Sequence, residues 1–306
     1  MLDTIRLKFP IALEFEQLQG WIQKITSTQS GGFRQSFIYN PKINDDVMLK
    51  YTYYPLGYDC KPLLLLEFSL PKLLYGNNFQ MLGSIDGTIK LANIFLAHVP
   101  NAPILDLAEG ILIRLDICYN HQVGDAVDDY IKALGNLDYP HRRTKYHRYE
   151  GVEFKAKHIT TKFYNKQHEC GIPEAFGILR QETTIMSSKA IQKLFGRRKP
   201  TLLDVTRDFV IQFLNDELKK LGLLNNSIGT HDTSLNTLCS SYGELAGVYY
   251  FNLQGLKMDK SRKQLSQHTK THPRSLDRRL RKILDAGLPL TLTDREEPLP
   301  PLVIDL

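Results

Sequence analysis

Apolar and polar residues alternate along much of the chain before residue 199, and a period of two is typical of half-buried β-strands. Glycine, proline, asparagine and aspartate separate these runs and give each the length of a strand. The runs predict strands at residues 5–9, 47–54, 63–69, 111–119, 151–157, 159–165 and 176–185. Between them, apolar residues recur with the helical period and predict helices at 13–25, 85–98, 125–134 and 187–195. Interleaved strands and helices indicate an α+β domain with a mixed or antiparallel sheet.

The pattern becomes helical after Gly196 and Pro200, two residues that end helices or discourage their continuation. We therefore predict an α+β domain at residues 1–198 and a helical domain at 199–306. The final residues, 299–306, are rich in proline and apolar residues. They fit either an extended closing strand or a peptide that binds a partner.

Two short helices are expected near the end of the chain, at residues 259–270 and 274–284, with a break at Thr271-His272-Pro273. A pair of short helices with a tight connection resembles a helix-turn-helix motif. The inward side of the second helix would consist of Leu276, Leu280, Ile283 and Leu284. Its basic residues would be available to phosphates or base edges: Arg274, Arg278, Arg279, Arg281 and Lys282.

Positive charge is concentrated in two places, although the formal net charge of the chain is only +6. Residues 256–285 carry ten Lys and Arg against three Asp, and residues 141–166 carry eight against two Glu. Two basic clusters on an otherwise acidic chain indicate a polyanion bound at two places. A solvated charged face is the alternative for either cluster taken singly. In the first cluster the candidate DNA contacts are Arg142, Arg143, Lys145 and Arg148.

The strand at 159–165 contains the candidate nucleophile, Tyr164. Extended through Lys166, the alternation places Thr160, Lys162, Tyr164 and Lys166 on one face. An ammonium group favours a nearby phenolate and holds a nearby phosphate, so the segment has the chemistry of a tyrosine that attacks a phosphodiester. A surface strand with a tyrosine and two solvated lysines is the alternative.

Two further strands each place an arginine and a carboxylate on one face: Arg114 with Asp116, and Arg180 with Glu182. Both have the pattern Leu/Ile-Arg-x-acid, which suggests an imperfect internal duplication. A carboxylate in a mostly apolar strand costs free energy unless it is paired or binds a metal. Each pair therefore fits either an ion pair or part of a joint site with Tyr164.

Oxygen ligands without a Cys or His cluster point to Mg²⁺ or Mn²⁺. The candidate ligands are Asp116 and Glu182, with Glu169 and Glu67 as secondary ones. His268 and His272 could form a metal pair, but phosphate contact or plain surface is the alternative. The four cysteines show no C-x-x-C spacing, and no apolar run or leader is long enough for a membrane span or a signal peptide, which favours a cytoplasmic protein. No glycine-rich nucleotide loop is present, which excludes a P-loop ATPase and a dinucleotide enzyme.

Four segments occur in a characteristic order. They are Leu64 to Asn78 with Leu70-Pro71-Lys72, then Arg114-Leu115-Asp116-Ile117, then Lys162-Phe163-Tyr164-Asn165-Lys166-x-x-Glu169, then Leu179-Arg180-Gln181-Glu182-Thr183. This order resembles the phage and plasmid replication initiators of the filamentous-phage gene II/X type. It is similar, more distantly, to plasmid rolling-circle initiators with a Tyr-acid-Lys-x-x-Glu segment. The resemblance covers about residues 1–200. Asn165 stands where relatives often have an acid.

The resemblance implies a metal-dependent endonuclease that nicks one strand of origin DNA through a 5′-phosphotyrosine. The nick leaves a 3′-hydroxyl to prime synthesis, and the enzyme later rejoins the strand. Tyr164 would be the nucleophile with Lys162 and Lys166 beside it, and Asp116 and Glu182 would be metal-side carboxylates. Tyr146 and Tyr149 are rival or auxiliary nucleophiles.

The expected partner is origin DNA, both duplex and single-stranded, with host helicase and polymerase as further candidates. The α+β domain would nick and join DNA, and the helical domain would place it on the duplex. Two other functions stay open: a non-catalytic helix-turn-helix regulator of a mobile element, and a nuclease that uses water and forms no covalent link.

Overall fold

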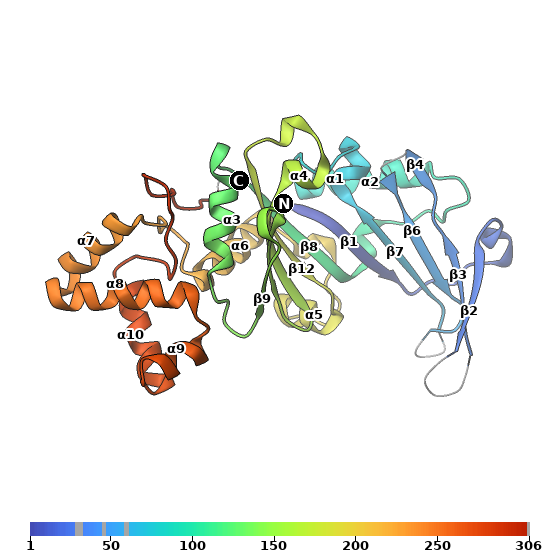
Figure 1. Cartoon of the computed structure of the whole chain (residues 1–306). Helices are drawn as coiled ribbons and strands as arrows, with labels where there is room; N and C mark the ends of the chain where they lie inside the picture. The colour runs from blue at the N-terminus through green and yellow to red at the C-terminus, as the bar shows by residue number, and fades with distance from the viewer. Residues whose placement is uncertain (28–32, 45–46, 58–60, 305–306) are drawn as a thin grey trace. The chain divides into compact units, whose positions relative to one another are not determined.

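The computed structural model describes residues 1–27, 33–44, 47–57 and 61–304 (Figure 1). The chain divides into two compact units, each built from two segments. Unit 1 comprises Met1–Cys118 and Thr183–Val210, and unit 2 comprises Tyr119–Glu182 and Ile211–Leu306. Strands β8 (Ile111–Gln122) and β12 (Ile178–Ile185) therefore contribute residues to both units. The domain boundary expected between residues 198 and 199 stays a prediction.

Unit 1 contains an antiparallel sheet with the order β2-β3-β6-β7-β1-β8. Alternate residues of β1 are buried, Ile5, Leu7 and Phe9 among them, and β7 repeats this pattern with Leu64, Leu66 and Phe68. The period-two pattern of the sequence thus places one side of these strands in the core. Besides β8, the strands are β1 (Leu2–Phe9), β2 (Ile22–Ser27), β3 (Phe33–Tyr39), β6 (Lys50–Tyr54) and β7 (Leu63–Ser69), with β4 (Lys42–Asn44) and β5 (Val47–Met48) as a separate pair.

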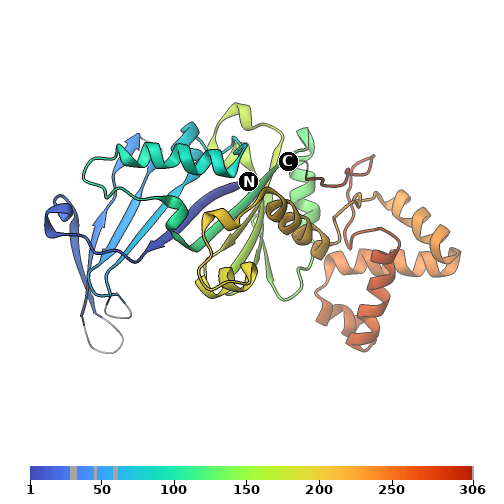
Figure 2. The same ribbon diagram turned by 180° about the vertical axis from the view of Figure 1, so that it is seen from behind.

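The helices of unit 1 begin at serine caps. The Ser69 hydroxyl accepts a hydrogen bond from the Lys72 backbone N–H, and Ser84 and Ser187 cap in the same way. Helix α2 presents Ile85, Ile89 and other apolar residues to the core and is seen in front of the strands in Figure 2. The helices are α1 (Leu70–Tyr75), α2 (Ile85–Ala97) and α5 (Ser188–Phe195).

The prediction of a helix at residues 13–25 is wrong. Only a 3-10 turn forms, at Phe15–Leu18, and it ends before Gly20. Gly20 has a φ of 81°, a left-handed conformation that ends a helix. Trp21 then packs against Tyr39 with ring centroids 5.4 Å apart, and its indole N–H donates to the Asn101 carbonyl. The chain is thereby fixed in an extended path and continues as β2, which pairs with β3.

In unit 2, strands β12-β11-β10-β9 are neighbours in that order, and β10 is antiparallel to both β9 and β11. One face of these strands packs against helix α3, where Phe154 and Phe163 meet edge to face with centroids 6.4 Å apart. The sheet of unit 2 is therefore covered on that side. The bounds are β9 (Arg143–Tyr146), β10 (Gly151–Lys155), β11 (Ile159–Asn165), α3 (Val127–Gly135) and α4 (Lys166–Cys170).

The helical pattern after residue 199 is confirmed. The helices are α6 (Arg207–Leu221), α7 (His231–Tyr242), α8 (Glu244–Asp259), α9 (Arg262–His268) and α10 (Pro273–Asp285) (Figure 1). Leu276, Leu280 and Ile283 are buried as expected, whereas Leu284 is exposed. The helix expected from residue 259 begins later, because Ser261 caps α9 with its hydroxyl. None of the described helices is both long and apolar enough to cross a bilayer.

Residues 288–304, here called the C-terminal strap, run back over unit 2. The Tyr130 hydroxyl of α3 donates to the Pro300 carbonyl at 2.5 Å, and Thr291 donates to the Ala133 carbonyl at 2.9 Å. Short β-bridges join Leu299 to Ile228 and Leu302 to Leu224. The final residues were expected to be either a closing strand or a peptide that binds a partner. The described part, up to residue 304, packs on unit 2 as a closing segment. Its buried apolar residues are Leu288, Leu290, Leu292, Leu299, Leu302 and Ile304.

Candidate active site

Tyr164 lies near the end of β11, on the face opposite the one that packs against α3. Its neighbours Thr161 and Phe163 are fully buried on the α3 side, while Tyr164 itself is partly exposed. Across the ladder it pairs with Gly151. A Cβ atom at that position would lie 2.8 Å from the Tyr164 Cβ, so only glycine leaves room for this backbone approach.

The Tyr164 hydroxyl donates a hydrogen bond to Glu182 Oε2 on β12, at 2.9 Å. Arg180 approaches the same oxygen, with its Nε at 3.5 Å, and its Nη1 donates to Asn120 Oδ1 at 3.3 Å. The guanidinium is fully buried and the Glu182 side chain is 14% exposed. The structure therefore brings the predicted nucleophile to a carboxylate that can accept its proton.

Lys166 is not on the strand face that the alternation predicts. Asn165 ends β11, and its side-chain oxygen accepts from the His168 backbone N–H, so Lys166 is the first residue of α4. The Lys166 side chain is buried, with Nζ 2.5 Å from Glu169 Oε2 and 5.7 Å from the centroid of the Tyr164 ring. The Lys166 ammonium is thus close to Tyr164, but Lys166 belongs to helix α4 and not to the strand. The need for an N-cap explains an asparagine at 165.

Glu67 and Asp116 belong to an ion-pair network in unit 1. Arg114 donates to both, at 2.7 Å from Nη1 to Glu67 Oε1 and 2.7 Å from Nη2 to Asp116 Oδ2, and Arg6 also pairs with Glu67. Burial alone would lower the pKa of Arg114, but the carboxylates of Asp116 and Glu67 outweigh it and raise that pKa. Asp116 and Glu67 thus form ion pairs with arginine, one of the two arrangements expected for Asp116.

Each of the four carboxylates expected as metal ligands has a partner within its own unit. Glu169 pairs with Lys166, Glu182 accepts from Tyr164, and Asp116 and Glu67 share Arg114. Within the described residues no group of three or more His, Cys, Asp or Glu side chains is arranged to hold a metal ion. A common site for Mg²⁺ or Mn²⁺ formed by the four carboxylates stays a prediction.

Arg142, one of the predicted DNA contacts, has a structural position instead. Its side chain is 7% exposed, and Nη1 lies 2.9 Å from Oε2 of the fully buried Glu217. Tyr139 donates to the other Glu217 oxygen at 2.8 Å, and Thr161 and Lys220 complete the cluster. Burial alone would raise the pKa of Glu217, but Arg142 and the hydrogen bonds lower it. Sequence alone could not separate this arginine from its exposed neighbours.

The other predicted DNA contacts of the first cluster are accessible. Arg143 and Lys145 project from β9, and Arg148 follows in the 3-10 turn Arg148–Glu150. The rival nucleophile Tyr146 pairs across the ladder with Val152, which places it on the α3 side, and its ring lies against Gly135. The side chain of Tyr149 lies outside the described part of the structure.

Helix α10 exposes the predicted basic residues. Arg274, Arg278 and Arg281 are exposed along it. Arg279 donates to the Tyr249 hydroxyl at 2.6 Å, and the Lys282 Nζ lies 5.6 Å from the centroid of the Tyr242 ring. His272 caps the helix, since its Nδ1 accepts from the Arg274 N–H at 3.3 Å, and this gives it a structural role.

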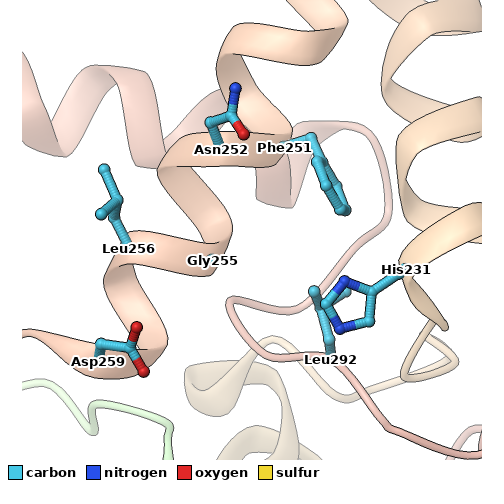
Figure 3. Close-up of a pocket in the computed structure, with 7 residues that line it drawn as sticks. All are labelled: His231, Phe251, Asn252, Gly255, Leu256, Asp259 and Leu292. Atoms are coloured by element: carbon cyan, nitrogen blue, oxygen red, sulfur yellow. The ribbon is translucent and has the colours of Figure 1, made fainter.

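A shallow cavity of about 390 Å³ lies among α7, α8 and the C-terminal strap (Figure 3). Phe251, Leu256 and Leu292 supply apolar walls, and His231 and Asp259 are its titratable groups. Figure 3 shows these two side chains on different elements, one from α7 and one from α8. The cavity has neither a nucleophile paired with a base nor a cationic residue. The Tyr164 site is chemically the better candidate.

No protein-family model matches the chain, and no curated protein matches it at a significant level. Among solved structures, it is similar to a rolling circle replication initiator protein from Geobacillus stearothermophilus, with a TM-score of 0.39 and 13% sequence identity. The match covers 72% of this chain and 84% of that chain. At this TM-score and identity the likeness carries no argument about function, and we infer function from the residues of this chain.

Proposed function

We propose that the protein is a DNA nicking and closing endonuclease that initiates rolling-circle replication, of the filamentous-phage gene II/X type. The observation that carries the proposal is the 2.9 Å hydrogen bond from the Tyr164 hydroxyl to Glu182 on a partly exposed, basic face. A tyrosine hydroxyl needs help to act as a nucleophile at neutral pH, because its ordinary pKa is near 10. Glu182 supplies a proton acceptor at hydrogen-bonding distance.

In the proposed step the Tyr164 oxygen attacks the phosphorus of a phosphodiester while its proton passes to Glu182 Oε2. The bond from phosphorus to the 3′-oxygen breaks, and that oxygen takes up a proton from solvent and becomes a free 3′-hydroxyl. The phosphate stays on Tyr164 as a 5′-phosphotyrosine. Rejoining is the reverse reaction, in which the 3′-hydroxyl attacks the phosphotyrosine and restores both the phosphodiester and the phenol.

Lys162 and Lys166 have different places in this proposal. Lys162 shares the polar face of β11 with Tyr164 and can contact phosphate, as an ammonium does. Lys166 is buried, so it fixes the Tyr164 ring and the start of α4 and does not contact DNA. The need for Mg²⁺ or Mn²⁺ stays a prediction, and the step above uses no metal. Chelation with EDTA, followed by addition of each ion alone, tests it.

Covalent trapping tests the proposed function. The protein is incubated with supercoiled origin DNA and Mn²⁺, denatured, and examined for a protein–DNA adduct. Wild type should give an adduct that Tyr164→Phe abolishes and that the matched control Tyr146→Phe retains. An adduct that survives Tyr164→Phe would refute the nucleophile assignment. Cleavage without an adduct would favour a hydrolytic nuclease.

We propose further that α9 and α10 place the protein on duplex origin DNA. Exposed arginines on a helix that follows a tight turn suit contacts with phosphates and base edges. Replacing Arg278, Arg279 and Arg281 by glutamine should weaken origin binding. It should also lower the slope of the salt dependence by about 0.9 for each phosphate that the protein no longer neutralises. An unchanged salt slope would remove α10 from the interface.

The runner-up is a non-catalytic regulator that uses the same helices, and α10 favours it as much as it favours an initiator. The two are separated by cleavage, because a regulator binds origin DNA without nicking it under any metal. Host helicase and polymerase are expected partners only under the first proposal.

A further inference from the structure

We propose that Asp138 is a positioning residue that decides which phosphodiester is nicked. It ties the helices proposed to bind duplex DNA to the strands that carry Tyr164. This inference rests on the proposed nicking function and names a determinant of its specificity. Asp138 lies in the connection between α3 and β9, outside both basic clusters of the sequence. In this proposal it contacts neither DNA nor the reacting atoms, and it acts through Arg262 of α9.

The backbone on both sides of Asp138 is fixed. Leu137 and Tyr139 are buried, and the Tyr139 hydroxyl donates to the buried Glu217 at 2.8 Å. The Leu137 carbonyl accepts a hydrogen bond from the Thr144 hydroxyl of β9 at 3.2 Å. Strand β9 pairs with β10, which pairs with β11. The Asp138 carboxylate therefore projects from a connection that is anchored to these strands.

One oxygen of Asp138 holds two of the C-terminal helices. Lys257, near the end of α8, places its Nζ 3.0 Å from Asp138 Oδ2. Arg262, the first residue of α9, places its Nε 3.3 Å from the same oxygen. The Lys257 side chain is 3% exposed, whereas that of Arg262 is 49% exposed. The lysine is thus a buried anchor, and the arginine is a surface contact that can be removed without opening the core.

Arg262 extends this link to α10. Its Nη1 lies 2.8 Å from Asp277 Oδ1, so one guanidinium joins Asp138 to Asp277. The planar fork of an arginine gives such a contact a defined direction. Along α10, Asp277 follows Arg274 by three residues and precedes Arg281 by four, a spacing that makes helix residues neighbours. The link therefore reaches the row of arginines proposed to contact duplex DNA.

Apolar packing holds α9 and α10 in place but gives their orientation little direction. Their buried residues are Leu265, Leu276, Leu280 and Ile283. Apolar burial is non-directional, whereas the Arg262 contacts depend on the angle between the helices. Half-exposed ion pairs add little to stability because solvent screens them. We therefore expect the link to fix an orientation and to contribute little to the free energy of unfolding.

The orientation of α10 matters because the nicked bond is the one that lies at the Tyr164 hydroxyl when the duplex is bound. Successive phosphates of one strand are only about 3.4 Å apart along the axis of duplex DNA. A turn of α10 that moves the duplex by this distance presents the neighbouring phosphodiester. The reaction itself tolerates still less, since a misplacement of about 1 Å costs about 10²-fold in rate.

Mapping the nick at nucleotide resolution tests the positioning role. Full-length wild type and Arg262→Gln are incubated with supercoiled origin DNA, and the ends of the nicked strand are located on a sequencing gel. Wild type should give one predominant position. Arg262→Gln should at least halve the fraction of nicks at that position and move the rest to neighbouring phosphodiesters. Origin affinity should change by less than about fivefold, the range of one exposed ion pair.

Lys263→Gln is the matched control, because it removes the same charge from the next residue of α9, which is also exposed. It should keep the single nick position. Arg262→Lys retains a cation beside Asp138 and should return most nicks to the wild-type position. A merely structural role would lower the Tm and total nicking without spreading the nicks. One nick position in folded Arg262→Gln would overturn the proposal, as would an equal spread in Lys263→Gln.

Asp138→Asn tests the residue itself and should spread the nicks in the same way. This change also takes the carboxylate away from the buried Lys257, so thermal denaturation accompanies it. If the variant is unfolded at the assay temperature, Arg262→Gln decides the question alone. A folded Asp138→Asn protein with one nick position would overturn the assignment to Asp138.

The proposed function can fail separately. Amide hydrogen exchange of the full chain without DNA measures the link directly, and Arg262→Gln should speed exchange in α9 and α10 but not in β9, β10 and β11. An absent adduct in wild-type protein would refute nicking and, with it, the nick position. Normal adduct formation, with one nick position and unchanged exchange in Arg262→Gln, would refute the positioning role alone.

Discussion

Strands β8 and β12 carry the same short pattern, an aliphatic residue followed by arginine, any residue and an acid, yet the two acids have different partners. In unit 1, Arg114 binds Asp116 and Glu67 together, with Arg6 outside them, so the charges are satisfied among themselves. In unit 2, Arg180 is fully buried and approaches Glu182 Oε2. The same oxygen accepts a hydrogen bond from the Tyr164 hydroxyl.

The difference lies in the residue presented by another strand. Strand β7 presents a second carboxylate, Glu67, to Arg114, and the result is an ion-pair network. Strand β11 presents Tyr164, a neutral group with a transferable proton. The same local pattern therefore gives a stabilising network in one unit and a candidate proton acceptor in the other. If this interpretation is correct, substitutions in unit 1 should change stability, and those beside Tyr164 should change activity.

The largest effect is expected for Glu182→Gln. Loss of the proton acceptor should lower the nicking rate by a factor of about 10² to 10⁴. Asp116→Asn is the matched change in unit 1 and should lower it by less than about tenfold, since Asp116 binds Arg114. Single-turnover nicking of supercoiled DNA measures both. An Asp116→Asn protein that is folded but inactive would show that Asp116 also acts in catalysis.

A large loss of stability is expected for Arg142→Met in unit 2. It removes the buried cation of the fully buried Glu217 and leaves only the more exposed Lys220, and breaking one side of a buried pair costs about 3–5 kcal/mol. Urea denaturation measures the free energy of unfolding. Because the pKa of Glu217 is lowered in the folded state, its contribution is present above the unfolded pKa and is lost as pH falls through the folded one. Arg143→Met, one residue on and exposed, should cost little.

The free energy of unfolding should depend on pH through His121. This histidine is buried, and its Nε2 is hydrogen-bonded to Gln181 Oε1 at 3.0 Å. Burial lowers its pKa to about 4, although the bond to Gln181 raises it somewhat. The unfolded chain binds the proton first, so stability should fall as pH drops from about 6.5 toward 4, by about 3 kcal/mol in all. His121→Gln should flatten that part of the profile in urea denaturation. A profile identical to wild type would contradict a neutral buried imidazole.

The smallest effect is expected for Arg6→Gln, at the edge of the unit 1 network. The Arg6 side chain is 38% exposed, and pairs of this kind are worth about 0–1 kcal/mol because solvent screens them. Thermal denaturation should therefore show a small shift, and nicking should be unchanged. A loss as large as that of Arg142→Met would mean that the unit 1 network is as critical as the buried cluster of unit 2.

The sequence predicted the strands well where one face is buried, because a period of two is imposed by the core. It failed at residues 13–25, where the positions of Gly20 and Trp21 decide the path and the helical period is accidental. It also could not show that Lys166 begins a helix, since that depends on the side chain of Asn165 capping the next turn.

Within the candidate site, the pairing of Tyr164 with Glu182 follows from faces and neighbouring strands that alternation can indicate. The burial of Arg142 does not, because its partner Glu217 lies 75 residues further along the chain on α6. The role of Gly151 has a signal in the sequence, a glycine at the start of a strand. Only the register shows that it faces Tyr164.

The C-terminal strap has a consequence for the order of events during synthesis. Leu299 and Leu302 form β-bridges with Ile228 and Leu224. The Pro300 carbonyl accepts a hydrogen bond from the hydroxyl of Tyr130, which lies 170 residues earlier in the chain. The α3 side of unit 2 is therefore completed only after residue 304 has left the ribosome. Contacts of such long sequence separation form slowly and leave apolar surface uncovered meanwhile. We expect the growing chain to depend on chaperones until then.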